Sequence, residues 1–157
     1  MQRQRGFTFI ELVITAAILG VLAAAAMPMI ELSLQRGKEQ ELRLALRQVR
    51  EAIDAYKKAA DEGRIARQAD ESGYPRRLEE LWAGVEDLKH PGKRKIYFLR
   101  RLPADPMFEG RTEIAAETWG KRSYESSPDA PKEGRDVFDV YSLSKRKGLN
   151  GIAYDQW

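Results

Sequence analysis

The chain has 157 residues, of which 32% are charged, and its formal net charge is +3. It has no cysteine and a single histidine, which excludes disulfides and thiolate sites and leaves few nucleophile–base pairs for catalysis. Without Arg3 and Arg5, which lie in the first few residues, the net charge is about +1, so bulk charge gives no case for nucleic-acid binding.

The N-terminal part of the chain contains a long apolar segment. Nothing ionisable lies from Leu12 to Ile30, a stretch of nineteen residues, and a helix of that length is roughly 28 Å long. Because the hydrocarbon core of a bilayer is about 30 Å thick, this segment is long enough to cross a membrane. Glu11 lies at its edge, where an unpaired carboxylate costs about 2–3 kcal/mol, and it is therefore expected to have a partner.

Two ordinary interpretations of this segment exist. The basic start and the small residues 23–26 fit a secretory signal peptide, but the apolar stretch is longer than the usual length of about 7–15 residues. A plain signal anchor carrying a monomeric periplasmic binding domain is the other interpretation. The signal-anchor interpretation leaves Glu11 without a function. It also predicts that the N-terminus of the mature protein is not Phe7, the residue that follows Gly6.

Residues 6–11 read GFTFIE after a short basic leader, and this arrangement resembles the type III leader of type IV pilins and pseudopilins. The resemblance implies that a prepilin peptidase cuts between Gly6 and Phe7 on the cytoplasmic side and then N-methylates Phe7. A methylated amine keeps its proton at neutral pH, so the Phe7 ammonium can pair with Glu11 of a neighbouring subunit in a filament core. Gly6 and Phe7 are thus the predicted processing residues, and Glu11 and Phe7 the predicted assembly residues.

The orientation follows from charge and from the leader. Arg3 and Arg5 precede the apolar segment and favour a cytoplasmic N-terminus. Arg36 and Lys38 follow the segment, so the charge signal is modest, and the leader resemblance decides for a single-pass inner-membrane protein with a periplasmic head.

Pro28 lies near the end of the apolar run and predicts a helix kink, because proline removes a backbone hydrogen bond; a proline tolerated at a helix boundary is the alternative. Beyond it, the pattern predicts an amphipathic helix over residues 31–61, with Gly63 as its stop. Its apolar residues recur at three- and four-residue steps: Leu42, Leu46, Val49, Ile53 and Tyr56. We expect this face to cover a sheet.

The remaining residues predict a small head. A short helix is expected at 78–82, strands at 96–99, 121–126 and 137–143, and a hairpin loop at 127–132. The expected fold class is α+β, with the long N-terminal helix packed on a small antiparallel sheet of about three to four strands. The expected divisions are a leader (1–6), a transmembrane or filament-core helix (7–30), its amphipathic half (31–61) and the periplasmic head (62–157).

Segments of the head are similar to the G-type major pseudopilin of type II secretion systems: GYP at 73–75, RRLPADP at 100–106, WG at 119–120 and FDVYS at 138–142. Two departures stand out. An extra stretch runs from Met107 to Thr118, and the region of the family's calcium loop carries Lys145, Arg146 and Lys147 where acids are usual. Calcium takes about six to eight oxygen ligands, so no calcium and no other cofactor is expected. The basic residues are either a solvated loop or face an acidic patch on the next subunit.

The resemblance implies a structural subunit and not an enzyme. It implies a homo-oligomeric helical filament, the periplasmic pseudopilus, which works with minor pseudopilins, an inner-membrane assembly platform and a cytoplasmic ATPase to drive folded proteins across the outer membrane. The alternative is a major or minor pilin of a surface type IV pilus, which serves adhesion, motility or DNA uptake. The absence of a cysteine pair and the small head favour secretion.

Overall fold

The computed structural model describes residues 8–92 and 94–157, apart from the side chains of Ala25 and Ala26. The predicted processing residues Gly6 and Phe7 lie outside the described residues. Contacts divide the chain into two compact units, Met1–Gly37 and Lys38–Trp157. The predicted division at residues 6, 30 and 61 stays a prediction.

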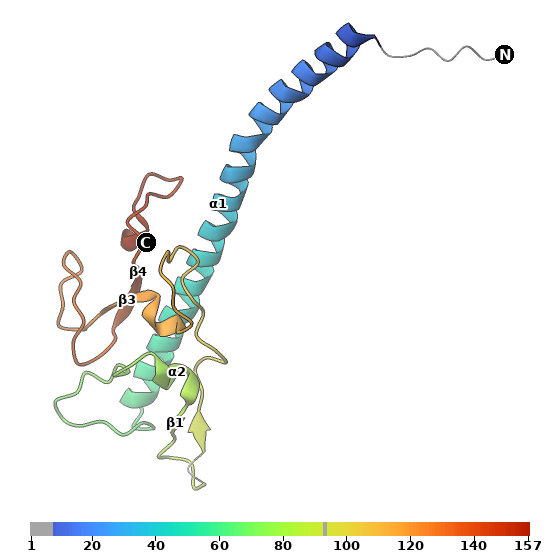
Figure 1. The fold of residues 1–157 in the computed structure, drawn as a ribbon. Coiled ribbons are helices and arrows are strands. Elements are labelled where there is room, and N and C mark those ends of the chain that lie inside the picture. Colours follow the sequence, from blue (N-terminus) through green and yellow to red (C-terminus); the bar gives the residue numbers. More distant parts are fainter. Residues whose placement is uncertain (1–7, 93) are drawn as a thin grey trace. The chain divides into compact units, whose positions relative to one another are not determined.

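Helix α1, Phe9–Asp61, is the longest element of the chain (Figure 1). It is assigned as one helix through Pro28, although Pro28 has no amide hydrogen to donate to the Ala24 carbonyl. The predicted kink therefore stays a prediction. The helix ends at Asp61, and the predicted stop residue Gly63 follows with a φ of 69° that suits glycine. The Gly63 amide donates a hydrogen bond to the Ala60 carbonyl and the Arg64 amide donates one to the Ala59 carbonyl, each at 2.9 Å.

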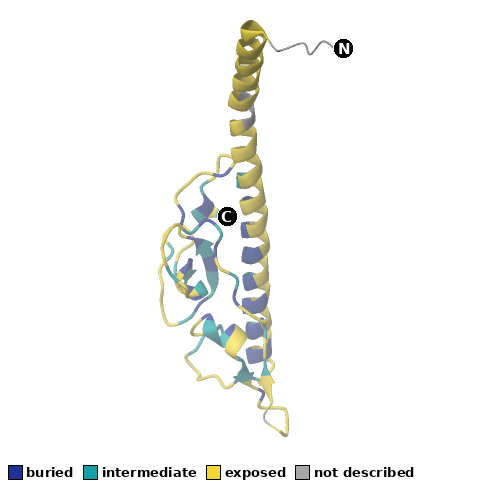
Figure 2. Cartoon of the chain, turned by 45° about the vertical axis from the view of Figure 1, so that its right-hand side comes forward, coloured by how far each residue is buried: buried dark blue, intermediate teal, exposed yellow. Residues whose placement is uncertain are grey.

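The predicted apolar stripe of the amphipathic helix forms the core of the head. Leu42, Val49 and Ile53 are fully buried, and Leu46 and Tyr56 nearly so. Figure 2 shows buried residues along this part of α1. Trp119, Tyr154, Leu78 and Leu81, from elsewhere in the head, are fully buried in the same core. The indole of Trp119 also donates a hydrogen bond to the Pro103 carbonyl at 2.8 Å, so its polar atom is satisfied inside the core.

The strands of the described residues form two antiparallel sheets of two strands each. Strand β1, Val85–Glu86, pairs with β2, Lys95–Ile96, and β3, Trp119–Arg122, pairs with β4, Asp139–Ser142. Gly120 lies opposite Tyr141, and a Cβ at this position would meet the tyrosine ring at 2.4 Å. The expected α+β fold with a long N-terminal helix is confirmed.

The strands differ from the predicted single sheet because other groups take their backbone bonds. The amides of Phe98 and Leu99 both donate to the Leu81 carbonyl, at 2.9 Å, and so β2 ends at Ile96. Leu81 belongs to helix α2, Glu79–Ala83, close to the predicted helix at 78–82. The Val137 amide donates to the Pro75 carbonyl at 2.8 Å, and β4 begins two residues later.

The extra stretch from Met107 to Thr118 contributes the buried side chains of Met107 and Ala116 to the core. It contains the short 3₁₀ helix η1, Ala115–Glu117. The Asp105 amide donates to the Thr118 hydroxyl oxygen at 2.9 Å, so the two ends of the stretch are held together. The carboxylate of Asp105 is buried and accepts hydrogen bonds from the Met107 amide, at 2.7 Å, and the Ser142 hydroxyl, at 2.6 Å. This network fixes the base of the stretch.

Candidate assembly site

The first turn of α1 is closed by a reciprocal contact between Thr8 and Glu11. The Glu11 amide donates to the Thr8 hydroxyl oxygen at 3.3 Å, and the Thr8 amide donates to a Glu11 carboxylate oxygen at 3.4 Å. Because Thr8 precedes the helix and Glu11 is its third residue, this is a capping box. The sequence reasoning missed Thr8, although the spacing T-x-x-E before an apolar run is the signal that identifies it.

The carboxylate of Glu11 is exposed, and Thr8 is its only hydrogen-bond partner among the described residues. The contacts are long for bonds to a charged group, which usually span about 2.7–2.9 Å. The carboxylate also lies near the positive end of the helix dipole. By the described residues Glu11 is therefore weakly held, and it can accept a stronger bond from a cation of another subunit.

The apolar half of α1 has nothing to cover it in the first unit. Phe9, Val21 and Met29 each expose at least two thirds of their surface, and the helix passes the length and hydropathy criteria for a membrane span. A helix that is apolar on every side needs lipid or other apolar helices around it. This unit is suited to a bilayer and to packing against copies of itself.

A second site lies in the head, where the segment after β4 meets the beginning of the helix in that unit. Glu39 is 6% exposed and accepts hydrogen bonds from the Leu149 amide, at 2.8 Å, and from the Tyr154 hydroxyl, at 2.9 Å. One α1 turn later, the Arg43 guanidinium lies 4.4 Å from the centre of the Trp157 ring. These contacts hold residues 144–157 against the helix.

In the segment after β4, where no calcium is expected, the positive charge of Lys145 lies beside an acidic side chain. Lys145 Nζ lies 2.8 Å from Asp155 Oδ2, and this hydrogen bond raises the pKa of Lys145 above its ordinary value. Arg146 lies 3.4 Å from Glu109, which belongs to the extra stretch. No group of three or more His, Asp or Glu side chains among residues 8–92 and 94–157 is arranged to hold a metal ion. The donor set present here favours an internal ion pair.

The sequence of the chain is similar to a known family motif and to known proteins. A family profile described as "Prokaryotic N-terminal methylation motif" matches residues 1–27. The type II secretion system core protein G of Klebsiella pneumoniae is 30% identical over 151 residues, which cover 93% of this chain and all of the relative. The proteins of the same name from Escherichia coli K12 and Pseudomonas aeruginosa are 26% and 28% identical and cover 92% and 91% of this chain. No solved structure matches the chain significantly.

The relatives favour the secretion pseudopilin over the surface pilin. The N-terminal motif, the long apolar helix and the α+β head are the parts from which such a subunit is built. The chain belongs to the family of type II secretion system core protein G, and it is a type IV pilin-like pseudopilin subunit of that system.

Proposed function

We propose that this subunit is cleaved between Gly6 and Phe7, methylated on Phe7, and lifted from the inner membrane into a periplasmic helical filament of identical subunits. The match of the methylation motif to residues 1–27 supports the processing step. The exposed apolar helix supports a core made of neighbouring helices. The proposed partners are the prepilin peptidase, minor pseudopilins and an inner-membrane assembly platform, and growth of the filament exports folded proteins.

The observation that carries this proposal is the state of Glu11. It is an ionisable residue that begins an otherwise charge-free membrane helix, and its contacts to Thr8 within the chain are long. The ammonium of a processed Phe7 in the next subunit would give it a short, charge-assisted bond. Burial of either charge without the other costs free energy, so subunits would be held in the register that brings the two charges together.

The head is proposed to face the periplasm, with the processed N-terminus at the cytoplasmic side. The basic residues Arg3 and Arg5 before the apolar segment support this orientation.

The role of the head is structural and not catalytic in this proposal. The names of the relatives, which are core components of a secretion system, support that view. Bound calcium is not needed, since Lys145 and Glu39 already tie the segment after β4 to its surroundings.

Three variants separate the intersubunit pair from the capping box. Glu11→Gln keeps an acceptor for the cap but removes the charge, Glu11→Val removes both, and Thr8→Ala removes only the cap hydroxyl. We expect all three to be processed normally. Loss of one partner of a buried charge pair costs about 2–5 kcal/mol, so both Glu11 variants should lose filaments and Thr8→Ala should keep them. Normal filaments from Glu11→Gln would refute the Phe7–Glu11 pair.

Deletion of the gene tests the system in which the subunit works. We expect loss of specific secreted proteins while filaments sheared from the cell surface are unchanged. Loss of surface filaments with secretion intact would instead assign the chain to a surface pilus. Complementation with the wild-type gene is the control.

A further inference from the structure

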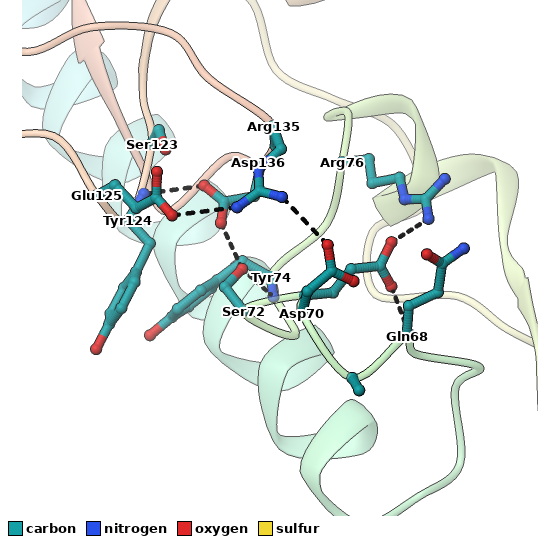
Figure 3. A pocket seen from close by; sticks show the side chains of 12 residues that line it. Gln68, Asp70, Ser72, Tyr74, Arg76, Ser123, Tyr124, Glu125, Arg135 and Asp136 are labelled. Carbon is teal, nitrogen blue, oxygen red and sulfur yellow. Dashed lines mark hydrogen bonds and ion pairs between the residues drawn. The ribbon is translucent and has the colours of Figure 1, made fainter.

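The head contains a cavity of about 610 Å³ between the loop that follows α1 and the loop that joins β3 to β4 (Figure 3). Residues 68–72, 74 and 76 line one side, and residues 123–125 and 135–136 line the other. The lining carries four carboxylates and two guanidinium groups, which leaves an excess of negative charge: Asp70, Glu71, Glu125 and Asp136 against Arg76 and Arg135. The cavity therefore suits a cation.

The carboxylates of this acidic pocket have two different roles. Asp136 holds the loops together, since it accepts hydrogen bonds from the Ser72 hydroxyl and, at 2.9 Å, from the Tyr124 amide. Asp70 and Glu125 instead share Arg135, at 3.3 and 3.2 Å, and all three side chains are more than two thirds exposed. Ion pairs in water are weak. Asp70 and Glu125 can therefore exchange Arg135 for an incoming cation without disturbing the fold.

Two tyrosine rings form the apolar wall of the acidic pocket. Tyr74 and Tyr124 stack with their ring centres 5.7 Å apart, and Phe138 contacts both edge to face. Tyr124 is 59% exposed and offers a ring face to a cation. The wall already takes one such contact, because Lys57 Nζ lies 5.6 Å from the Tyr74 ring centre.

The head also presents a matching basic loop, residues 145–147. The side chains of Lys145 and Arg146 are 82% and 66% exposed, even though each contacts a carboxylate. Lys147 is exposed and forms no ion pair with any residue that the structure describes. Three consecutive basic residues thus lie on the surface, and among the described residues the charge of Lys147 has no ion-pair partner.

The acidic pocket and the basic loop lie at opposite ends of the helical segment in the head. The segment after the basic loop is bound to Glu39, whereas the pocket lies beside Lys57. Eighteen residues of α-helix separate these two positions, which is roughly 27 Å. The two surfaces therefore cannot meet within one subunit. Complementary surfaces at different places on identical subunits form heterologous contacts, which repeat into an open helical filament when the rotation between subunits does not close into a ring.

We propose that the basic loop 145–147 of one subunit docks on the acidic pocket of a second copy of this chain, with Lys147 against Glu125 and the Tyr124 ring. The inference rests on the pseudopilin function and specifies a head-to-head contact of the filament. Charge complementarity sets the partner and the register of this contact, and salt weakens it because the groups are exposed.

Disulfide crosslinking tests the contact directly, because the natural chain has no cysteine. The full-length chain with Glu125→Cys and Lys147→Cys, oxidised in cells that assemble filaments, should give a ladder of dimers, trimers and larger species. A disulfide needs Cα atoms within about 7 Å, so the helix length rules out a bond inside one subunit. The matched control pairs Glu125→Cys with Lys89→Cys; Lys89 is also basic and exposed but lies in the loop of the β1–β2 hairpin. A ladder from the control alone, or from neither pair, overturns the proposal.

Charge exchange gives a second readout that does not depend on cysteine. Glu125→Lys and Lys147→Glu should each lower filament yield roughly two- to fivefold, because single exposed ion pairs are weak, and the double variant should restore the yield. A double variant no better than the singles overturns the contact. Secretion by the wild-type chain, in a strain without its own protein G, is scored separately. Restored secretion without a 125–147 ladder refutes only this interface, whereas failure of both refutes the interface and the secretion function together.

Discussion

The buried carboxylate of Glu39 accepts a hydrogen bond from the Leu149 amide at 2.8 Å, although 110 residues separate them in the sequence. The same oxygen accepts a hydrogen bond from the Tyr154 hydroxyl at 2.9 Å. One side chain of α1 thus ties down the segment that carries the basic residues Lys145 to Lys147. This contact joins the segment that follows the basic loop to α1.

Loss of the Glu39 carboxylate should weaken the head. In Glu39→Ala, the Tyr154 hydroxyl and the Leu149 amide lose their acceptor, and an unsatisfied buried group costs about 1–3 kcal/mol. Glu39→Gln keeps an acceptor oxygen and is the matched control. Denaturant unfolding of the detergent-solubilised chain, followed by tryptophan fluorescence, measures the difference. Equal stability of wild type and Glu39→Ala would contradict this account.

The β1–β2 hairpin should open in acid. Arg64 Nη2 lies 2.6 Å from Asp87 Oδ2, and this hydrogen bond holds the pKa of Asp87 below its ordinary value of 3.8. A lowered pKa means that the folded state binds the proton less tightly than the unfolded state. The stabilisation is therefore fully present above pH 3.8 and is lost as the pH falls through the folded pKa.

Hydrogen exchange of the hairpin amides between neutral pH and pH 2, corrected for the intrinsic rates, measures this loss. The Asp87 amide, which donates to the Arg94 carbonyl, is a suitable probe. Wild type should lose protection in the acid range, and Arg64→Gln should show low protection with little dependence on pH. A hairpin equally protected in both chains would show that the ion pair is not what holds it.

Calcium should not bind to the segment after β4. Lys145 forms an ion pair with Asp155 Oδ2. The other carboxylate oxygen, Asp155 Oδ1, is buried and has no hydrogen-bond partner among the described residues. Calcium takes about six to eight oxygen ligands with carboxylates among them, and Asp155 offers one unpartnered carboxylate oxygen. Isothermal titration of the full-length chain in detergent should show no binding at micromolar calcium. Binding in that range, by wild type or by Lys145→Ala, would show that the loop retains a calcium site.

The parts predictable from sequence are those governed by local rules. The apolar stripe of α1 follows from a period of 3.6 residues, and its end follows from Gly63, whose positive φ lets the chain turn after the helix. The capping box of Thr8 and Glu11 belongs to the same class, since its two members are three residues apart. The extent of β2 does not follow from local rules. The amides of Phe98 and Leu99, which would otherwise extend the strand, both donate hydrogen bonds to the Leu81 carbonyl.

The sequence by itself determined the membrane-length helix, the isolated acidic residue at its start and the family resemblance, because each lies in a continuous stretch whose spacing carries the information. Only the tertiary structure decided which polar groups meet. Glu39 with Leu149 and Arg135 with Asp70 are pairs between distant segments, and nothing in their local pattern names the partner. Such contacts form only after burial of the apolar core has brought the loops together, and they position the surfaces through which the subunits are proposed to assemble.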